Sequence, residues 1–421
     1  MRQVYLDHQT TTPVRPEVFE AMKPYFSEAF GSPSSLHQHG LRARDALALA
    51  RERVAQLINA ESPDEIIFTS GGTESANLAV QGVAYASQRQ GNHIVLSAVE
   101  HPAVMNSAAF LGKRGFACTH VGVDSRGWVN PEDVSAAITE KTILVCVHHV
   151  NHDIGTIEPI REISRIAAQR GIAFFSDATA SGGWLPIDVR ALGVNLLSLS
   201  PHRFYGPKGV GILYRNRRAR LAGLLQGGMQ EEGRRAGTEN VPAIVGAGVA
   251  AELAARELPR RMVRTRELQK RLWDGLTGAV PRLRLNGPEL GPARIPTNIN
   301  LSAEFVEGEG LMLLSDMQGI AIASGSICAS QALKISHVLS AIGLDPDWAR
   351  AAVILSLGAG NTEEEIDYVI TSLAQAVAKL RGMCPAWDEF QRVLRDSAPV
   401  PAKRGKPAAG KAKVVSRKGA R

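Results

Sequence analysis

Two apolar stretches within residues 195–214 enclose polar residues of the kind that carry out chemistry. The first stretch has the composition of a buried strand and ends at Ser200, which is followed closely by His202 and Arg203. A Gly-Pro-Lys-Gly turn comes next, and residues 210–214 are typical of a second strand. Burying polar groups costs free energy unless they are paired. This segment therefore predicts a binding or catalytic site.

Three further segments place polar residues where an expected strand ends. A glycine turn leads from a strand at 65–70 into a helix that begins near Thr73, and the free N–H groups of a helix N-terminus attract anions. A plain turn is the alternative interpretation of this segment. His101 follows another expected strand, and Asp177 ends a third, where a buried carboxylate is costly unless it is paired.

Three histidines lie close together in the sequence, at positions 148, 149 and 152. Successive side chains of a strand point to opposite faces, so His148 and His149 are not expected to share one ion. No carboxylate or thiolate spacing completes a ligand set. The sequence therefore predicts no metal site.

Cys328 lies in the segment Ser-Gly-Ser-Ile-Cys. Its Gly and Ser neighbours indicate an exposed loop, which favours a reactive thiol. An isolated cysteine is, however, more often a small buried apolar residue, so both interpretations stay open. The four cysteines show no CxxC spacing, and we expect reduced thiols and a cytoplasmic protein.

The elements that must position these residues alternate between strands and helices as far as about residue 250. This alternation predicts a mainly parallel sheet in an α/β fold. A charged amphipathic helix at 256–279 is expected to lead into a smaller domain. We expect a large domain at 14–257, a small domain formed by 1–13 and 258–397, and a disordered basic tail at 398–421.

The net charge of +7 originates in this tail. Residues 403–421 contain eight Lys or Arg and no acidic residue, so the rest of the chain carries a formal net charge of −1. A solubilising tail is the plain interpretation, and weak contact with an anionic partner such as RNA is the functional one. No apolar run reaches the roughly 18 residues that cross a bilayer, so no membrane partner is expected.

Taken together, the motifs resemble those of the cysteine desulfurases, which belong to class V of the aminotransferases that use pyridoxal 5'-phosphate (PLP). The family motif Ser-x-His-Lys-x-x-Gly-Pro-Lys-Gly corresponds to residues 200–209, and Thr-Ser-Gly-Gly-Thr-Glu-Ser corresponds to 69–75. A third motif, Gly-Gly-x-Gln-Glu-x-Gly-x-Arg-Ala-Gly-Thr, corresponds to 227–238. The resemblance covers about residues 1–385. It implies the PLP-dependent transferase fold type I, with a large and a small domain, and a homodimer.

The resemblance also implies roles for the candidate residues. The expected PLP-binding residues are Thr73, Asn151, Asp177, Ser200, His202, Arg203 and Thr238. Thr238 reaches the phosphate in the partner subunit, and Asp177 pairs with the ring nitrogen, which makes the ring an electron sink. His101 stacks on the ring. Cys328 takes the sulfur of L-cysteine as a persulfide, leaving L-alanine, and passes it on, for example toward iron–sulfur assembly.

Three positions depart from the family pattern. Arg203 stands where the family has the lysine that holds PLP as a Schiff base, and a guanidinium does not condense with an aldehyde. Ala180 replaces a glutamine that contacts the phenolic oxygen, and Ile354 replaces the arginine that grips the substrate carboxylate. Lys208 lies five residues further on, in the turn, and is not expected to replace the missing lysine.

These losses leave open whether the protein is an enzyme. We expect a cysteine-desulfurase-like protein without normal PLP–lysine catalysis, which acts as a dimeric sulfur-relay or binding protein and exchanges sulfur with another protein through Cys328. The alternative is an active class V enzyme that holds PLP non-covalently and uses a substrate without a carboxylate, since the phosphate-binding motifs and Asp177 persist. A scaffold that binds nucleic acid through its tail is the third interpretation.

Overall fold

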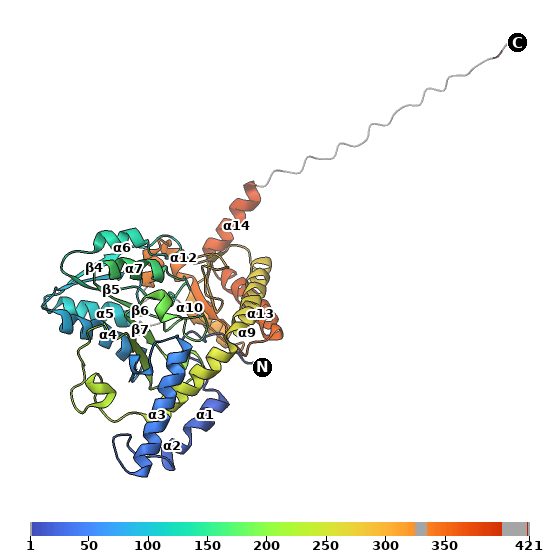
Figure 1. Ribbon diagram of the computed structural model, residues 1–421. Helices are drawn as coiled ribbons and strands as arrows, with labels where there is room; N and C mark the ends of the chain where they lie inside the picture. The colour runs from blue at the N-terminus through green and yellow to red at the C-terminus, as the bar shows by residue number, and fades with distance from the viewer. Residues whose placement is uncertain (1, 325–334, 398–418, 420–421) are drawn as a thin grey trace.

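A seven-stranded sheet is the central element of the structure, a computed structural model that describes residues 2–324, 335–397 and 419 (Figure 1). The order of its strands is β2-β8-β7-β6-β5-β3-β4. They are β2 (Ile66–Thr69), β3 (His93–Ser97), β4 (Ala117–Val121), β5 (Thr142–Cys146), β6 (Ala173–Asp177), β7 (Leu196–Leu199) and β8 (Gly211–Arg215). Strand β8 is antiparallel to both of its neighbours, whereas β3 to β7 pair in parallel. The predicted α/β fold with a mainly parallel sheet is confirmed.

Both faces of this sheet are buried. Strand β5 is an example: its residues are nearly all apolar, because alternate side chains pack on opposite faces of the sheet. Leu144 and Cys146 pack into the cluster under α4 (Gly72–Ser87) and α5 (Pro102–Gly112). Val145, between them, packs into the cluster on the other face. That face is covered by α3 (Gln38–Leu57), α6 (Pro131–Ala137), α7 (Ile160–Gln169) and the first part of α9 (Val241–Ala279). The helices packed on both faces therefore fix the positions of the strand ends.

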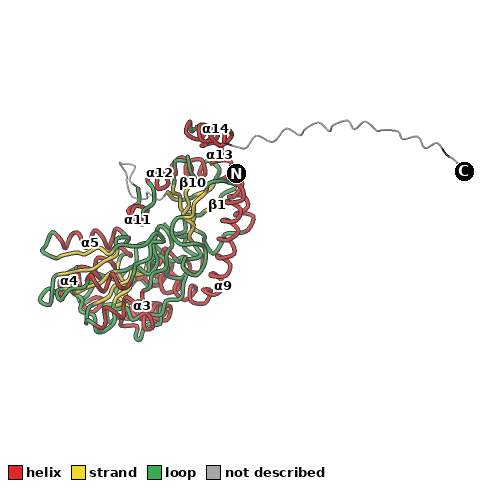
Figure 2. Tube along the Cα trace, turned by 90° about the horizontal axis from the view of Figure 1, so that it is seen from above, coloured by secondary structure: helices red, strands yellow, loops and turns green. Residues whose placement is uncertain are grey.

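A second group of elements packs against the second half of α9 (Figure 2). Its four-stranded antiparallel sheet has the order β12-β13-β10-β9, and a separate parallel pair joins β1 to β11. The strands are β1 (Val4–Tyr5), β9 (Leu283–Leu285), β10 (Asn298–Ala303), β11 (Ile320–Ala321), β12 (Ala323–Ser324) and β13 (Ala352–Ser356). Helices α10 (Gly308–Asp316) and α13 (Glu363–Arg381) contribute to its apolar core.

Helix α9 is longer than the sequence predicts. It runs from Val241 to Ala279, whereas the amphipathic pattern indicates only 256–279. The added part is rich in Ala and Gly and is buried, in contact with α3, so it lacks the polar face on which the prediction depends. The expected domain boundary at 257/258 falls inside this helix, and the division into two domains stays a prediction.

Six further helices complete the described chain. They are α1 (Pro16–Met22), α2 (Pro24–Ser27), α8 (Val189–Leu192), α11 (His337–Ala341), α12 (Pro346–Arg350) and α14 (Pro385–Ser397), with 3-10 turns at Pro63–Glu65, Pro201–Arg203 and Gln230–Gly233. None of the helices in the described ranges is long and apolar enough to cross a membrane. The predictions for Cys328 and for the tail, apart from residue 419, concern residues outside the described part of the chain.

Candidate active site

A cavity of about 580 Å³ opens where the strands of the large sheet end. Its walls come from the segments that follow β2, β3, β5, β6 and β7, together with the start of β8 and the N-terminal segment. In open α/β sheets, ligands bind outside the carboxyl ends of the strands. Six of the predicted site residues line this cavity: Thr73, His101, Asp177, Ser200, His202 and Arg203.

The N-terminus of α4 forms one wall of the cavity. The Gly72 N–H donates to the Ser200 hydroxyl oxygen at 3.1 Å, which ties the helix start to the end of β7. A Cβ atom on Gly72 would lie only 2.6 Å from that oxygen, so this close approach requires glycine. A Cβ on Gly71 would meet no atom within 4 Å. The space in front of the helix is therefore open to an anionic group, which the helix dipole favours.

Asp177 is held in place at the end of β6. Its Oδ1 accepts hydrogen bonds from the Ser198 hydroxyl at 2.8 Å and from the Thr179 N–H at 2.9 Å. The residue is 8% exposed and lines the cavity. These bonds fix the carboxylate in one orientation, so that it can pair with a cationic group of a ligand.

His101 caps the start of α5, where its Nδ1 accepts a hydrogen bond from the Ala103 N–H at 3.1 Å. Its ring meets that of His152 edge to face, with 5.1 Å between the ring centres. Burial lowers the pKa of His101 below its ordinary value and the pKa of His152 well below it. Both imidazoles are therefore uncharged at neutral pH. No sequence motif indicates that His152 lines this cavity, as it does.

Arg203 ends the 3-10 turn Pro201–Arg203, lines the cavity and is partly buried. Its Nε is a buried atom without a hydrogen-bond partner among the described residues. Its carbonyl oxygen accepts from Trp184 Nε1 at 3.0 Å, which fixes the backbone. Burial lowers the pKa of Arg203, while Asp177 and Asp7 oppose that shift, so the guanidinium remains charged.

Ala180 lies beside this arginine. Both residues line the main cavity and also a small second pocket that is bordered by His8 and Trp184. The short side chain of Ala180 leaves space that a longer side chain would take. Two of the three departures from the family motifs therefore occur at neighbouring positions of one wall.

Lys208 also lines the cavity, although it is exposed to solvent. The spacing of five residues predicts that Lys208 does not replace the missing lysine, and this stays a prediction, although the structure brings Lys208 to the same cavity. The chain between the two folds back as a turn, so both residues reach the same wall. The Gly-Pro-Lys-Gly sequence was the signal that could have indicated this.

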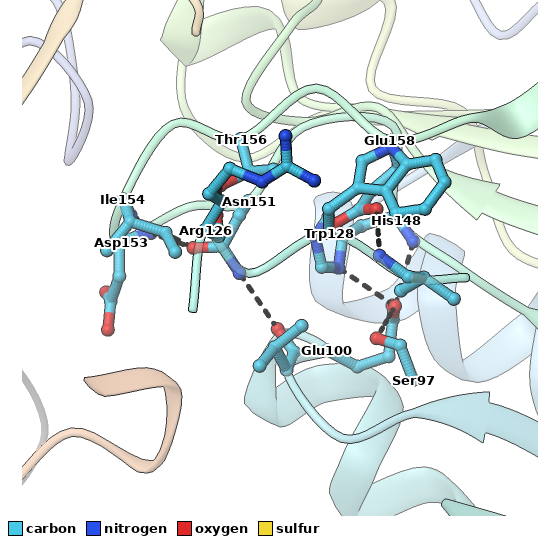
Figure 3. Close-up of polar contacts among 12 residues, drawn as sticks. Ser97, Glu100, Arg126, Trp128, His148, Asn151, Asp153, Ile154, Thr156 and Glu158 are labelled. Atoms are coloured by element: carbon cyan, nitrogen blue, oxygen red, sulfur yellow. Dashed lines mark hydrogen bonds and ion pairs between the residues drawn. The ribbon is translucent and has the colours of Figure 1, made fainter. Parts of the chain in front are cut away.

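Three predicted positions lie elsewhere. The Asn151 side chain accepts from the N–H groups of Asp153 and Ile154 and donates to the Val99 carbonyl at 3.2 Å, so it shapes the turn after β5 (Figure 3). Thr238 is exposed and lines a smaller neighbouring pocket of about 170 Å³. Cys328 lies outside the described residues. The roles that the family resemblance gives these three residues stay predictions.

At the cavity wall, His148 is buried between two carboxylates (Figure 3). Its Nδ1 lies 2.9 Å from Glu100 Oε1, and its Nε2 lies 3.4 Å from Glu158 Oε1. The same Glu100 oxygen also accepts from the Ser97 hydroxyl at 2.6 Å. The two carboxylates outweigh the effect of burial and raise the pKa of His148 to about 10. His148 is therefore a buried cation.

His149 points the other way, as expected for successive residues, and its Nδ1 lies 2.9 Å from the Ser181 hydroxyl oxygen. Across the described ranges, no group of three or more His, Cys, Asp or Glu side chains is arranged to hold a metal ion. His148 and His149 therefore bond to different partners.

Comparison with known proteins places this site in a family. The model of the aminotransferase class V family matches residues 4–369. The cysteine desulfurase IscS of Clostridium botulinum (strain Hall) is 46% identical over 391 residues, covering 93% of this chain and 98% of that protein. The cysteine desulfurase IscS of Methanosarcina thermophila is 44% identical over 393 residues, covering 93% and 96%.

Solved structures agree with this assignment. A NifS-like protein has a TM-score of 0.84 at 34% identity, covering 90% of this chain and all of that one. The structure described as SspA in complex with cysteine has a TM-score of 0.76 at 34% identity, covering 86% and 100%. The expected PLP-dependent transferase fold is thereby confirmed. The chain belongs to the class V aminotransferases, a PLP-dependent family, and is cysteine-desulfurase-like.

Proposed function

We propose that this protein is a cysteine-desulfurase homologue that holds PLP in the cavity without a covalent lysine link and does not carry out the usual turnover of L-cysteine. The observation that carries the proposal is Arg203 on the cavity wall, in the motif position where the family has its lysine. A guanidinium stays protonated, so it neither forms the link nor accepts a proton as a lysine amine does.

The residues of the cavity fit PLP. The open space at the start of α4, with Ser200 and His202 beside it, suits a phosphate group. Asp177, oriented by Ser198, suits a protonated ring nitrogen, and the uncharged His101 ring suits stacking. When bound, PLP supplies an electron sink for a negative charge that develops next to the amino nitrogen of a substrate.

The protein's own groups would bind and orient such a ligand, but they lack the usual proton carrier. His101 and His152 are uncharged and line the cavity, so they would pack against the ligand and exclude water. Two donors hold Asp177 Oδ1 in one orientation next to the ligand. This arrangement favours a binding or sulfur-relay role, with Cys328 as the residue that carries the sulfur.

A second candidate is an active class V enzyme that uses non-covalently held PLP on an altered substrate. Its support is the oriented Asp177, because a carboxylate paired with the ring nitrogen makes the ring an electron sink as well as binding it. Turnover of other amino compounds by the PLP-loaded protein would favour this candidate over the relay.

We further propose a homodimer. Thr238 is exposed and lies outside its own chain's cavity, next to the Ser70 and Gly209 that line both pockets. This position suits a residue that completes the phosphate site of a partner subunit.

We expect the purified protein to bind PLP without a covalent mark. Equilibrium dialysis should show bound PLP, and borohydride reduction followed by peptide mass spectrometry should find no modified lysine, because residue 203 has no amine. Sedimentation of the same sample should show a dimer. The Lys208→Arg variant is the control, since it keeps the charge and removes the lysine that lines the cavity. A PLP-modified Lys208 in the unmodified protein would contradict the proposal.

We expect Cys328 to be alkylated before Cys118 and Cys146 under native conditions. Cys146 is fully buried, and burial raises its pKa well above the ordinary value, so it is neither reachable nor ionised. Burial also raises the pKa of the partly buried Cys118. Mass spectrometry after brief iodoacetamide treatment measures the order, with the Cys328→Ser variant as control. Faster labelling of Cys118 or Cys146 would remove the basis for a persulfide on Cys328.

A further inference from the structure

The guanidinium of Arg203 has a buried N–H donor that no acceptor among the described residues pairs with. Its Nε is buried without a partner among the described residues, and no carboxylate in those ranges lies within 4.0 Å of its nitrogens as an ion pair. A buried charged N–H group without an acceptor is unfavourable, and a ligand that brings an acceptor removes that penalty. The residue lines a cavity large enough for such a ligand.

The acidic residues around this cavity are already engaged. Glu74 accepts from the Ser70 N–H at 2.7 Å and pairs with Arg235 at 2.9 Å. Asp177 accepts from Ser198 and Thr179, and Asp7 accepts from the Thr10 hydroxyl at 2.7 Å. Asp177 and Asp7 moderate the positive potential at Arg203 but do not form an ion pair with it.

The phosphate group of PLP does not need Arg203. The open start of α4, the Ser200 hydroxyl and His202 supply that site from backbone and neutral side-chain donors. The cavity therefore offers two separate sets of anion-binding groups, and only the first is accounted for by PLP itself. The planar fork of a guanidinium matches a carboxylate through two parallel hydrogen bonds.

We propose that Arg203 binds the carboxylate of an α-amino acid, so that the cavity takes PLP and an amino acid together. This inference rests on the proposed function, and it names the substrate class of that site as carboxylate-bearing. Ile354, where the family has the carboxylate-binding arginine, is buried in β13 and offers no charge. Arg203 supplies the missing charge from the cavity lining, next to the space that the short Ala180 leaves.

Two stable probes test this assignment. N-(5'-phosphopyridoxyl)-L-alanine and N-(5'-phosphopyridoxyl)-ethylamine differ only in the carboxylate, and neither has an aldehyde that could react with a lysine. Isothermal titration calorimetry with the full-length protein should show the alanine probe binding about 10- to 100-fold more tightly, the range expected for a charge-assisted hydrogen bond. In Arg203→Met this ratio should fall to near one.

Matched variants separate the role of Arg203 from a general loss of charge. Lys208→Met removes another cation from the lining, and it should weaken both probes equally while keeping their ratio. Arg203→Lys should retain only part of the ratio, because an ammonium lacks the planar fork. It also serves as the second variant if Arg203→Met melts at a lower temperature than the unmodified protein.

The outcomes distinguish this inference from the proposed function. Equal affinity for the two probes in the unmodified protein would overturn the inference and leave PLP binding intact. Failure of both probes and of pyridoxamine 5'-phosphate to bind would overturn the proposed function. If the ratio of the two affinities fell to one in Lys208→Met but was kept in Arg203→Met, Lys208 would be the residue that binds the carboxylate. That result would contradict the inference.

Discussion

Replacing Arg203 with lysine should give the protein a covalently held PLP that the unmodified chain lacks. The new amine would project from the same backbone, which the Trp184 hydrogen bond to the carbonyl oxygen of residue 203 holds in place. Lysine is shorter than arginine, and the cavity next to it is open, so no steric obstacle is introduced. Visible absorbance after addition of PLP, and a modified Lys at position 203 after borohydride reduction, measure the result.

Release of sulfide from L-cysteine should follow a graded course across these variants. The unmodified protein lacks a proton carrier at residue 203, a role worth roughly two to four orders of magnitude in rate. Arg203→Lys alone should release little sulfide, because Ala180 and Ile354 still depart from the family. Adding Ala180→Gln and Ile354→Arg should raise the rate further.

The control for this series is Arg203→Gln, which has neither a cation nor an amine and should remain without covalent PLP. One result would contradict the interpretation of Arg203. If the unmodified protein produced alanine and sulfide from L-cysteine as fast as the triple variant, the lysine would not be needed.

Replacing Glu100 with glutamine should lower the free energy of unfolding by about 3–5 kcal/mol, the usual cost of removing one partner of a buried ion pair. Glu100 is fully buried, and its Oε1 is close to His148 Nδ1, to the His148 N–H and to the Ser97 hydroxyl. Without its charge, the buried imidazolium keeps only the more distant Glu158. Urea unfolding at neutral pH measures the change.

Glu20→Gln is the matched control, because Glu20 pairs with Lys23 on the surface. An exposed pair of this kind contributes at most about 1 kcal/mol, so the control should change the free energy of unfolding little. A similar small change in Glu100→Gln would mean that the buried pair does not stabilise the fold.

The pH dependence of unfolding provides a second check. The folded pKa of His148 is raised to about 10, above the ordinary value of 6.5, so the folded state binds the proton more tightly. The stability that the pair contributes is fully present below about pH 6.5 and is lost as the pH rises through 10. The unmodified protein should therefore lose more stability between pH 7 and 10 than His148→Gln. His149 and His152, whose pKa values are lowered, remain neutral across this window.

The sequence by itself determined the fold class and most of the wall of the site. Thr73 and Arg203 follow strands of strong apolar pattern and Asp177 ends another, and parallel strands end at one edge of a sheet. Segments that are more than a hundred residues apart therefore had to meet there. The sequence also determined that residue 203 does not form a Schiff base, because a guanidinium does not condense with an aldehyde wherever it lies.

Only the tertiary structure decided which way the side chains near these positions turn. Asn151 bonds its own turn, whereas His152 and Lys208, which sequence spacing had left out, line the cavity. The partners of His148 lie 48 residues before it and 10 residues after it, and no local pattern marks them as a buried charge cluster. The physical reason is that strand periodicity fixes the positions of backbones, while side-chain direction and pKa depend on contacts between distant segments.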